Sequence, residues 1–193
     1  MSIQTLLPLF CGGFFYIDSA TYGGESQAAS KSGNAYNVAK KLLAHSNVIF
    51  AHPILGHDDI LVMVTASTSA EFVLAVHEQI RLHLSDKHDY IVGTRSHIIS
   101  SYYGKPLSRD NFKKSKPVEA WLLLKVGVPD PAAEIPEILL KDDRITAVAP
   151  VFGDFDMFAF VEAASLDDLR DVIDETVRAK RHIFQSTTQL VLR

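Results

Sequence analysis

The chain of 193 residues repeats one short pattern, and this repeat limits the possible folds more than any other feature. An apolar segment, a glycine, two variable residues, an aspartate and a second apolar segment occur in residues 52–64 and again in residues 149–161. Four aligned positions are identical, and they include the turn residues Gly56 and Asp59, and Gly153 and Asp156. Apolar runs around a glycine-containing turn are typical of β-hairpins. We therefore expect an internal duplication.

Predicted elements around each hairpin follow one order, strand–helix–strand–strand–helix–strand. In the first half they fall at 14–20, 35–43, 48–55, 60–66, 69–84 and 90–100. In the second half they fall at 121–126, 129–140, 145–152, 157–162, 165–177 and 183–192. Ser165 is the expected N-cap of the last helix, and Pro136 argues for a late start or a kink of the helix within 129–140. This order is that of the ferredoxin-like split unit.

Several predicted strands are apolar on both faces, such as 61–64 and 122–124, so both faces of each sheet should be covered. The predicted fold class is α+β, with two tandem ferredoxin-like βαββαβ units of the dimeric α/β-barrel type whose sheets pack face to face. The expected domains are residues 1–100 and 118–193. Residues 101–117, rich in charge and containing two prolines, should form a solvated linker.

Composition excludes several classes of protein. The net charge of -4 offers no basic field for a nucleic-acid backbone. The single cysteine, Cys11, excludes a disulfide framework and a multi-cysteine metal site within one chain. No apolar run reaches the ~20 residues of a membrane span, and the start lacks the basic lead-in of a secretory signal. We expect a cytoplasmic protein with no membrane partner.

The second half resembles the RAM domain, the effector-binding module of the Lrp/AsnC family of transcription regulators. The resemblance lies in the segments 152–161, 165–169 and 186–191, and the first half matches more loosely through Gly56, Asp59 and 93–96. Members of that family carry a helix-turn-helix domain ahead of this module. Here 13 residues precede the first expected strand. A domain with a recognition helix does not fit in this length. Direct sequence-specific DNA binding is therefore not expected.

This resemblance implies a non-catalytic regulatory protein that binds an amino acid or a related small acid and needs no cofactor. Its partners would be further copies of itself or related RAM-domain proteins. The two turns would border the ligand, with Asp59 and Asp156 accepting hydrogen bonds from an ammonium group. Arg95 would bind a carboxylate, and Thr187 and Thr188 would offer hydroxyl groups. The plainer interpretation is that each aspartate closes its own hairpin and Arg95 pairs with a neighbouring acid.

Two other functions stay open. His52, His57 and His97 could hold a haem or a divalent metal, which would make the protein an enzyme on the same fold. The second half has Ala149, Asp154 and Gln189 at the corresponding places, so such a site would exist once. The third possibility is a pure assembly module that binds no ligand.

Overall fold

A computed structural model describes residues 13–18, 31–56, 58–75, 93–113, 116–127 and 134–192. The first half contains the following elements: β1 (Gly13–Asp18), α1 (Lys31–Leu42), β2 (Val48–Leu55), β3 (Ile60–Val64), α2 (Ser69–Leu74) and β4 (Gly93–Ile99). A connecting segment holds β5 (Tyr103–Gly104) and the short helix η2 (Arg109–Phe112). The second half contains β6 (Val118–Val126), α3 (Ile135–Leu139), β7 (Ile145–Phe152), β8 (Met157–Ala163), α4 (Leu166–Asp171), η3 (Val172–Arg178) and β9 (Ile183–Val191).

Strands from both halves belong to one antiparallel sheet, in the order β4-β1-β3-β2-β9-β6-β8-β7-β5. At one seam Ile54 of β2 pairs with Val191 of β9. At the other seam Ile98 of β4 pairs with Phe152 of β7. Because β4 also pairs with β7, eight strands close into a ring, and β5 lies beside β7 as a short addition.

The prediction of two tandem ferredoxin-like units with sheets packed face to face is therefore wrong. The halves are joined edge to edge through main-chain hydrogen bonds, which continue beyond the strands from the N–H of Leu192 to the carbonyl of Pro53 and from the N–H of Ser100 to the carbonyl of Pro150. The physical reason is that β2, β4, β7 and β9 would each leave an unpaired edge in a four-stranded sheet. Pairing these edges with one another satisfies their N–H and C=O groups.

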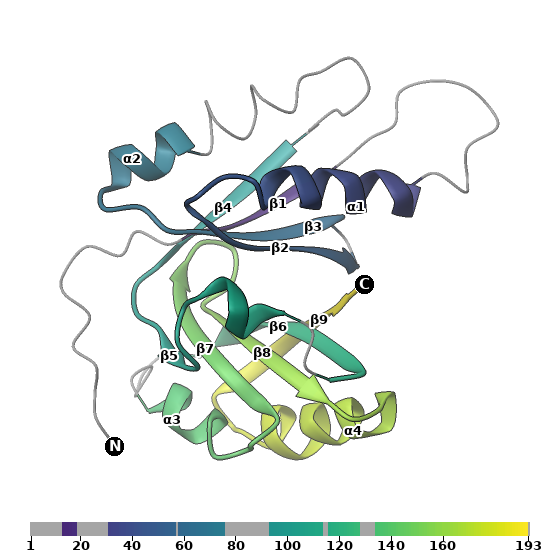
Figure 1. The fold of residues 1–193 in the computed structure, drawn as a ribbon. Coiled ribbons are helices and arrows are strands. Elements are labelled where there is room, and N and C mark those ends of the chain that lie inside the picture. The colour runs from purple at the N-terminus through teal and green to yellow at the C-terminus, as the bar shows by residue number, and fades with distance from the viewer. Residues whose placement is uncertain are drawn as a thin grey trace.

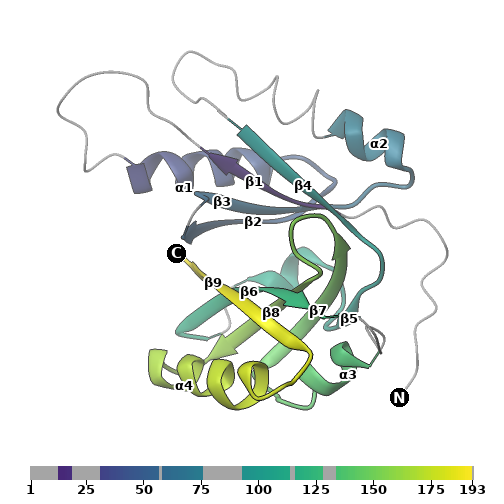
Figure 2. The ribbon, with the colours of Figure 1, turned by 180° about the vertical axis from the view of Figure 1, so that it is seen from behind.

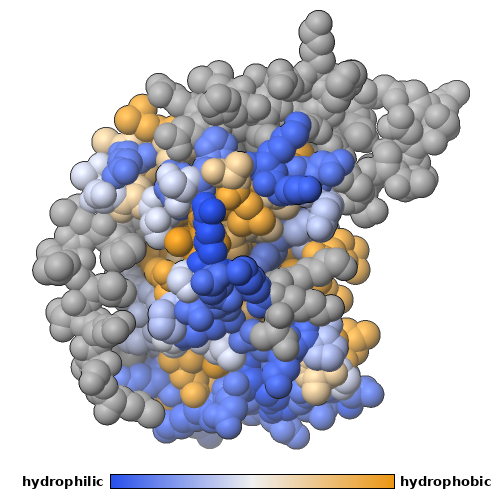
Figure 3. Space-filling view, in the orientation of Figure 1, coloured by the Kyte–Doolittle hydropathy of each residue, from blue (hydrophilic) through white to orange (hydrophobic). Residues whose placement is uncertain are grey.

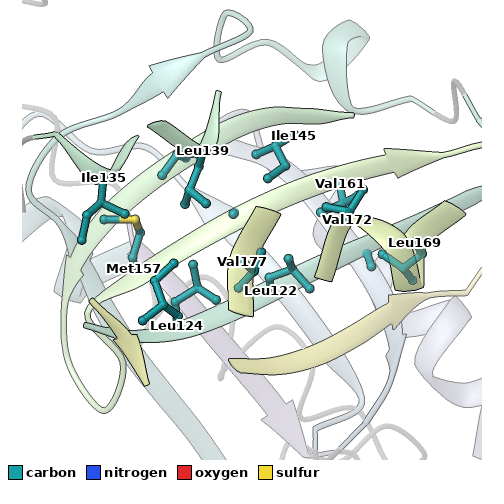
Figure 4. Packing of buried hydrophobic residues seen from close by; sticks show 14 of the residues in the cluster. Leu122, Leu124, Ile135, Leu139, Ile145, Met157, Val161, Leu169, Val172 and Val177 are labelled. Atoms are coloured by element: carbon teal, nitrogen blue, oxygen red, sulfur yellow. The ribbon is translucent and has the colours of Figure 1, made fainter. Parts of the chain in front are cut away.

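Each side of the ring has its own buried layer. Helices α1 and α2 cover the outer face of β1–β4, and α3 and α4 cover the outer face of β6–β9 on the opposite side of the molecule (Figures 1 and 2). Aliphatic side chains fill the space beneath α3 and α4 (Figure 4). Along β6, Leu122 and Leu124 point toward these helices, whereas Trp121 and Leu123 point into the ring. This alternation explains why the strand is apolar on both faces.

Aromatic and aliphatic side chains from both halves fill the inside of the ring. The buried members are Phe50, Ile54, Leu61, Met63, Ile99, Phe112, Trp121, Leu123, Ala147, Ala149, Val151, Phe158 and Phe160. One of them, Phe112, comes from the connecting segment and is 3% exposed. The expectation of a solvated linker is wrong at this residue, since η2 is fastened by Arg109, whose Nε donates to the carbonyl of Val48 at 2.9 Å.

Local sequence signals begin the two helices that follow the hairpins. The hydroxyls of Thr68 and Ser165 accept hydrogen bonds from the N–H groups of Glu71 and Asp168, both at 3.1 Å. The Ser165 cap is confirmed. Helix α3 begins at Ile135, directly before Pro136, in agreement with the predicted late start. Hydrophilic residues cover the middle of the face shown in Figure 3. Within the described part of the chain, no helix combines the length and the hydrophobicity that crossing a membrane requires.

Candidate functional site

The two repeated turns lie at the same end of the ring. β2 is antiparallel to β9, β9 to β6, β6 to β8 and β8 to β7, so β2 and β7 run in the same direction. The turns that follow β2 (56–59) and β7 (153–156) therefore share one end, together with the first residues of β4 and β9. We call this the turn end. The opposite end, which η2 covers, is the plug end.

At the turn end the ring of His97 lies against Gly153. His97 comes from β4 of the first half and is 1% exposed. A Cβ atom at Gly153 would lie 2.0 Å from Nδ1 of His97, which is far inside contact distance. Glycine is therefore required in this turn because the imidazole of the other half occupies the space of a side chain.

Apolar neighbours favour the neutral form of His97 over the charged form. Its ring lies 5.2 Å from that of Phe158 and 6.2 Å from that of Phe155, between centroids. Burial lowers the pKa of His97 below the ordinary value of 6.5, while the carboxylate of Asp154 acts in the opposite direction. A neutral imidazole keeps the nitrogen lone pair that metal coordination or proton transfer requires.

The same arrangement occurs at the other turn with a different side chain. A Cβ atom at Gly56 would lie 1.5 Å from Oε1 of Gln189, which comes from β9 of the second half. Gln189 is 1% exposed. Each turn glycine thus faces a polar side chain from the last strand of the other half. One of these side chains is an imidazole and the other an amide.

Arg95 lies two residues before His97 on the same face of β4, and its side chain is 42% exposed. Its Nη2 atom forms an ion pair with Oδ2 of Asp58, a buried residue of the first turn. The plainer interpretation of Arg95, pairing with a neighbouring acid, is therefore confirmed in the structure.

The turn aspartates make contacts that hold the sheet. Oδ2 of Asp156 accepts a hydrogen bond of 2.8 Å from the N–H of Val126 in β6. The carbonyl groups of Asp59 and Asp156 accept from the N–H groups of Ile54 and Val151 within their own hairpins. The two carbonyl contacts close the hairpins, whereas the carboxylate of Asp156 connects its turn to β6. A ligand-binding role for the aspartates stays a prediction.

The two threonines point to different sides of β9. Thr187 pairs with Leu123 and therefore faces the inside of the ring, whereas Thr188 pairs with Leu122 and faces the helices. Only Thr187 shares a face with Gln189. The structure thus brings His97, Arg95, Gly153, Gly56 and Thr187 to the inner side of the turn end and separates Thr188 from them.

Of the three histidines considered as ligands, His52 is part of the packing toward the plug end. Its Nδ1 accepts a hydrogen bond from Nε1–H of Trp121, and its Nε2 contacts the carbonyl of Phe112, both at 3.3 Å. Both nitrogens are therefore engaged. His57 lies outside the described residues. Within the residues that the structure describes, no group of three His, Cys, Asp or Glu side chains could hold a metal ion.

Charged side chains are buried at the plug end, where sequence reasoning did not expect them. Glu119 and Glu162 pair directly across β6 and β8 and are 4% and 8% exposed. Nζ of Lys105 lies 3.0 Å from Oε2 of Glu162 and over the rings of Phe112 and Phe160. Burial, and secondarily the charge of Glu162, raises the pKa of Tyr102 well above its ordinary value. The only sequence signal for this cluster is a glutamate within an apolar strand.

Comparison with known proteins identifies the fold. No family model matches the chain, and no curated protein matches it in sequence. The siroheme decarboxylase NirDL matches with a TM-score of 0.61 and 8% identity, over 95% of this chain and 72% of that one. Its complex with an iron-uroporphyrin III analogue matches with a TM-score of 0.58 and 9% identity. A chlorite dismutase variant from Candidatus Nitrospira defluvii, in complex with cyanide, matches with a TM-score of 0.51 and 16% identity, over 94% and 90% of the chains.

One shorter solved structure matches part of the chain, at a TM-score too low to support the resemblance to the RAM domain. FFRP-DM1, a feast/famine regulatory protein-like domain, is 27% identical over 39% of this chain and 99% of its own, with a TM-score of 0.37. The proteins that match nearly the whole chain are enzymes. The prediction of a non-catalytic Lrp/AsnC-type protein for amino-acid sensing and transcription regulation is therefore wrong.

Proposed function

We propose that this protein is an enzyme that binds an iron tetrapyrrole with carboxylate side chains at the turn end of the ring. The observation that carries the proposal is the buried imidazole of His97 on the same face of β4 as Arg95, whose charge contributes, after burial, to lowering the pKa of His97. The shared fold with a siroheme decarboxylase, also seen with an iron-uroporphyrin analogue, supports it. This proposal replaces the expectation that the protein needs no cofactor.

The donor chemistry of the described residues suits a tetrapyrrole better than a bare metal ion. A protein site for a divalent transition metal uses three or four protein ligands, whereas a macrocycle supplies four nitrogens and needs one axial side chain. His97 offers that one imidazole. Arg95 offers the paired N–H groups that bind a carboxylate, and Phe155 offers an apolar surface at the same turn.

Other places in the described structure fit such a group less well. The space between β6–β9 and the helices α3 and α4 is filled by aliphatic side chains (Figure 4). The plug end holds stacked aromatic rings and His52, whose two nitrogens are engaged. Since His97 is 1% exposed, binding requires that the turn 153–156 move away from the imidazole.

In the proposed site the tetrapyrrole supplies the redox or Lewis-acid chemistry of its iron. His97 would hold the iron or move a proton at one of its ring nitrogens. Arg95 would orient the group by exchanging the carboxylate of Asp58 for a carboxylate of the ligand. Apolar rings around His97 would exclude water, which strengthens both interactions.

A titration of the full chain with iron(III) uroporphyrin, followed in the Soret band, tests this proposal. We expect saturable binding with a shifted Soret maximum. The variant His97→Gln should bind at least about tenfold more weakly, whereas the control His182→Gln, at an exposed histidine, should bind as the wild type does. Equal binding by both variants, or no binding by the wild type, would refute the proposed site.

Carboxylate recognition can be separated from iron ligation with a second variant. Arg95→Gln should weaken the binding of iron uroporphyrin and leave the binding of an iron porphyrin without carboxylates unchanged. Arg181→Gln, at an exposed arginine, is the matched control. A loss of affinity for both porphyrins would show that Arg95 supports the fold instead.

A further inference from the structure

Gln189 keeps a buried oxygen atom that the fold does not use. Its side chain is 1% exposed, and it pairs across the sheet with Trp121. Within the part of the chain that the structure describes, Oε1 of Gln189 has no hydrogen-bond partner. The atom points at the turn end, where it occupies the place of a Cβ atom at Gly56.

A buried oxygen atom without a donor lowers the stability of the folded state. A buried acceptor that loses its water and gains no donor is costly, and most buried polar atoms in proteins are satisfied. An apolar side chain of the same length would fill the same space between Trp121 and Gly56 without this loss. Packing alone therefore gives no reason for an amide at this position, whereas a donor that arrives with a ligand does.

The position of Gln189 in the ring supports the same conclusion. Gln189 lies against Gly56 in the same way as His97 lies against Gly153. Each side chain comes from the last strand of one half and contacts the turn of the other half. Both turns lie at the turn end. A ligand that displaces the turn 153–156 from His97 lies at the same end as the acceptor of Gln189.

We propose that Oε1 of Gln189 accepts a hydrogen bond from the O–H group of a protonated carboxyl side chain of the bound tetrapyrrole. This inference rests on the proposed function. The two seams would then have different roles, with the imidazole of His97 at one and the hydrogen-bond acceptor of Gln189 at the other. Gln189 would orient the ligand and would take no part in iron coordination.

The test compares Gln189→Met, which keeps the length of the side chain and removes the amide, with Gln185→Met at an exposed glutamine of the same strand. For Gln189→Met we expect a higher melting temperature of the free protein and about tenfold weaker binding of iron uroporphyrin. Gln185→Met should change neither quantity.

The outcomes separate this inference from the proposed function. If the wild type shifts the Soret band and Gln189→Met binds equally well, Gln189 is not an acceptor for the ligand and only the inference fails. If Gln189→Met lowers the melting temperature of the free protein, the amide supports the fold and the inference fails as well. If the wild type binds no tetrapyrrole, the proposed function itself is refuted.

Discussion

The space that a side chain at Gly153 would need is filled by His97, because a Cβ atom there would lie 2.0 Å from Nδ1 of the imidazole. The two residues belong to different halves of the chain and meet where β4 pairs with β7. The glycine of the repeated turn is thus explained by a contact across the seam. Gly56 and Gln189 meet in the same way at the other seam.

Substitution of Gly153 should therefore act through His97. We expect Gly153→Ala to reduce the free energy of unfolding by about 1–3 kcal/mol, the usual range for overpacking. In the background of His97→Ala the same substitution should cost much less. A double-mutant cycle from denaturant unfolding measures this coupling, and additive effects would show that the two residues do not compete for space.

The stability of the protein should depend on pH through His97. Its pKa in the folded state lies below 6.5, so the unfolded chain binds more protons at acidic pH. The contribution of His97 is present above pH 6.5 and is lost as pH falls toward the lower, folded pKa. The difference in unfolding free energy between the wild type and His97→Gln should therefore decrease as pH is lowered. His182→Gln provides the control, and a constant difference would contradict the shifted pKa.

The buried charges at the plug end should be mutually dependent. Lys105→Met leaves the carboxylate of Glu162 buried without its cation, and we expect a loss of about 3–5 kcal/mol of unfolding free energy. The double variant Lys105→Met/Glu162→Gln should regain most of this loss. Lys113→Met, which breaks an exposed pair with Asp110, should leave the unfolding free energy nearly unchanged. A small effect of Lys105→Met would show that water reaches this cluster.

Asp142 should stabilise the fold only above acidic pH. Its carboxylate accepts hydrogen bonds from Arg144 and from Thr176. These bonds, above all those from Arg144, lower the pKa of Asp142 to about 2. The contribution of Asp142 is present above the unfolded pKa of about 3.9 and is lost as pH falls toward about 2. Asp142→Asn should therefore cost about 1–2 kcal/mol at neutral pH. Urea unfolding at several pH values tests this, with the exposed Asp167→Asn as the control.

Local patterns predicted the order of most of the described elements and the exact boundaries of two strands. The strands expected at 48–55 and 145–152 agree with β2 and β7, and the cap at Ser165 begins α4 as predicted. These elements are set by neighbours along the chain, namely apolar alternation, turn residues and caps. Of the candidate site, the sequence singled out His97, Arg95 and the two glycines. It did not show that each glycine faces a side chain of the other half.

By itself, the sequence determined the order of the elements, the repeated hairpins and the apolar character of both strand faces, because these depend on short-range spacing. Only the tertiary structure decided that one ring forms, that Phe112 fills its plug end and that His97 and Gln189 enter at opposite seams. The physical reason is that an unpaired strand edge accepts any partner of suitable register. Which edge it meets depends on how both halves fill the common interior.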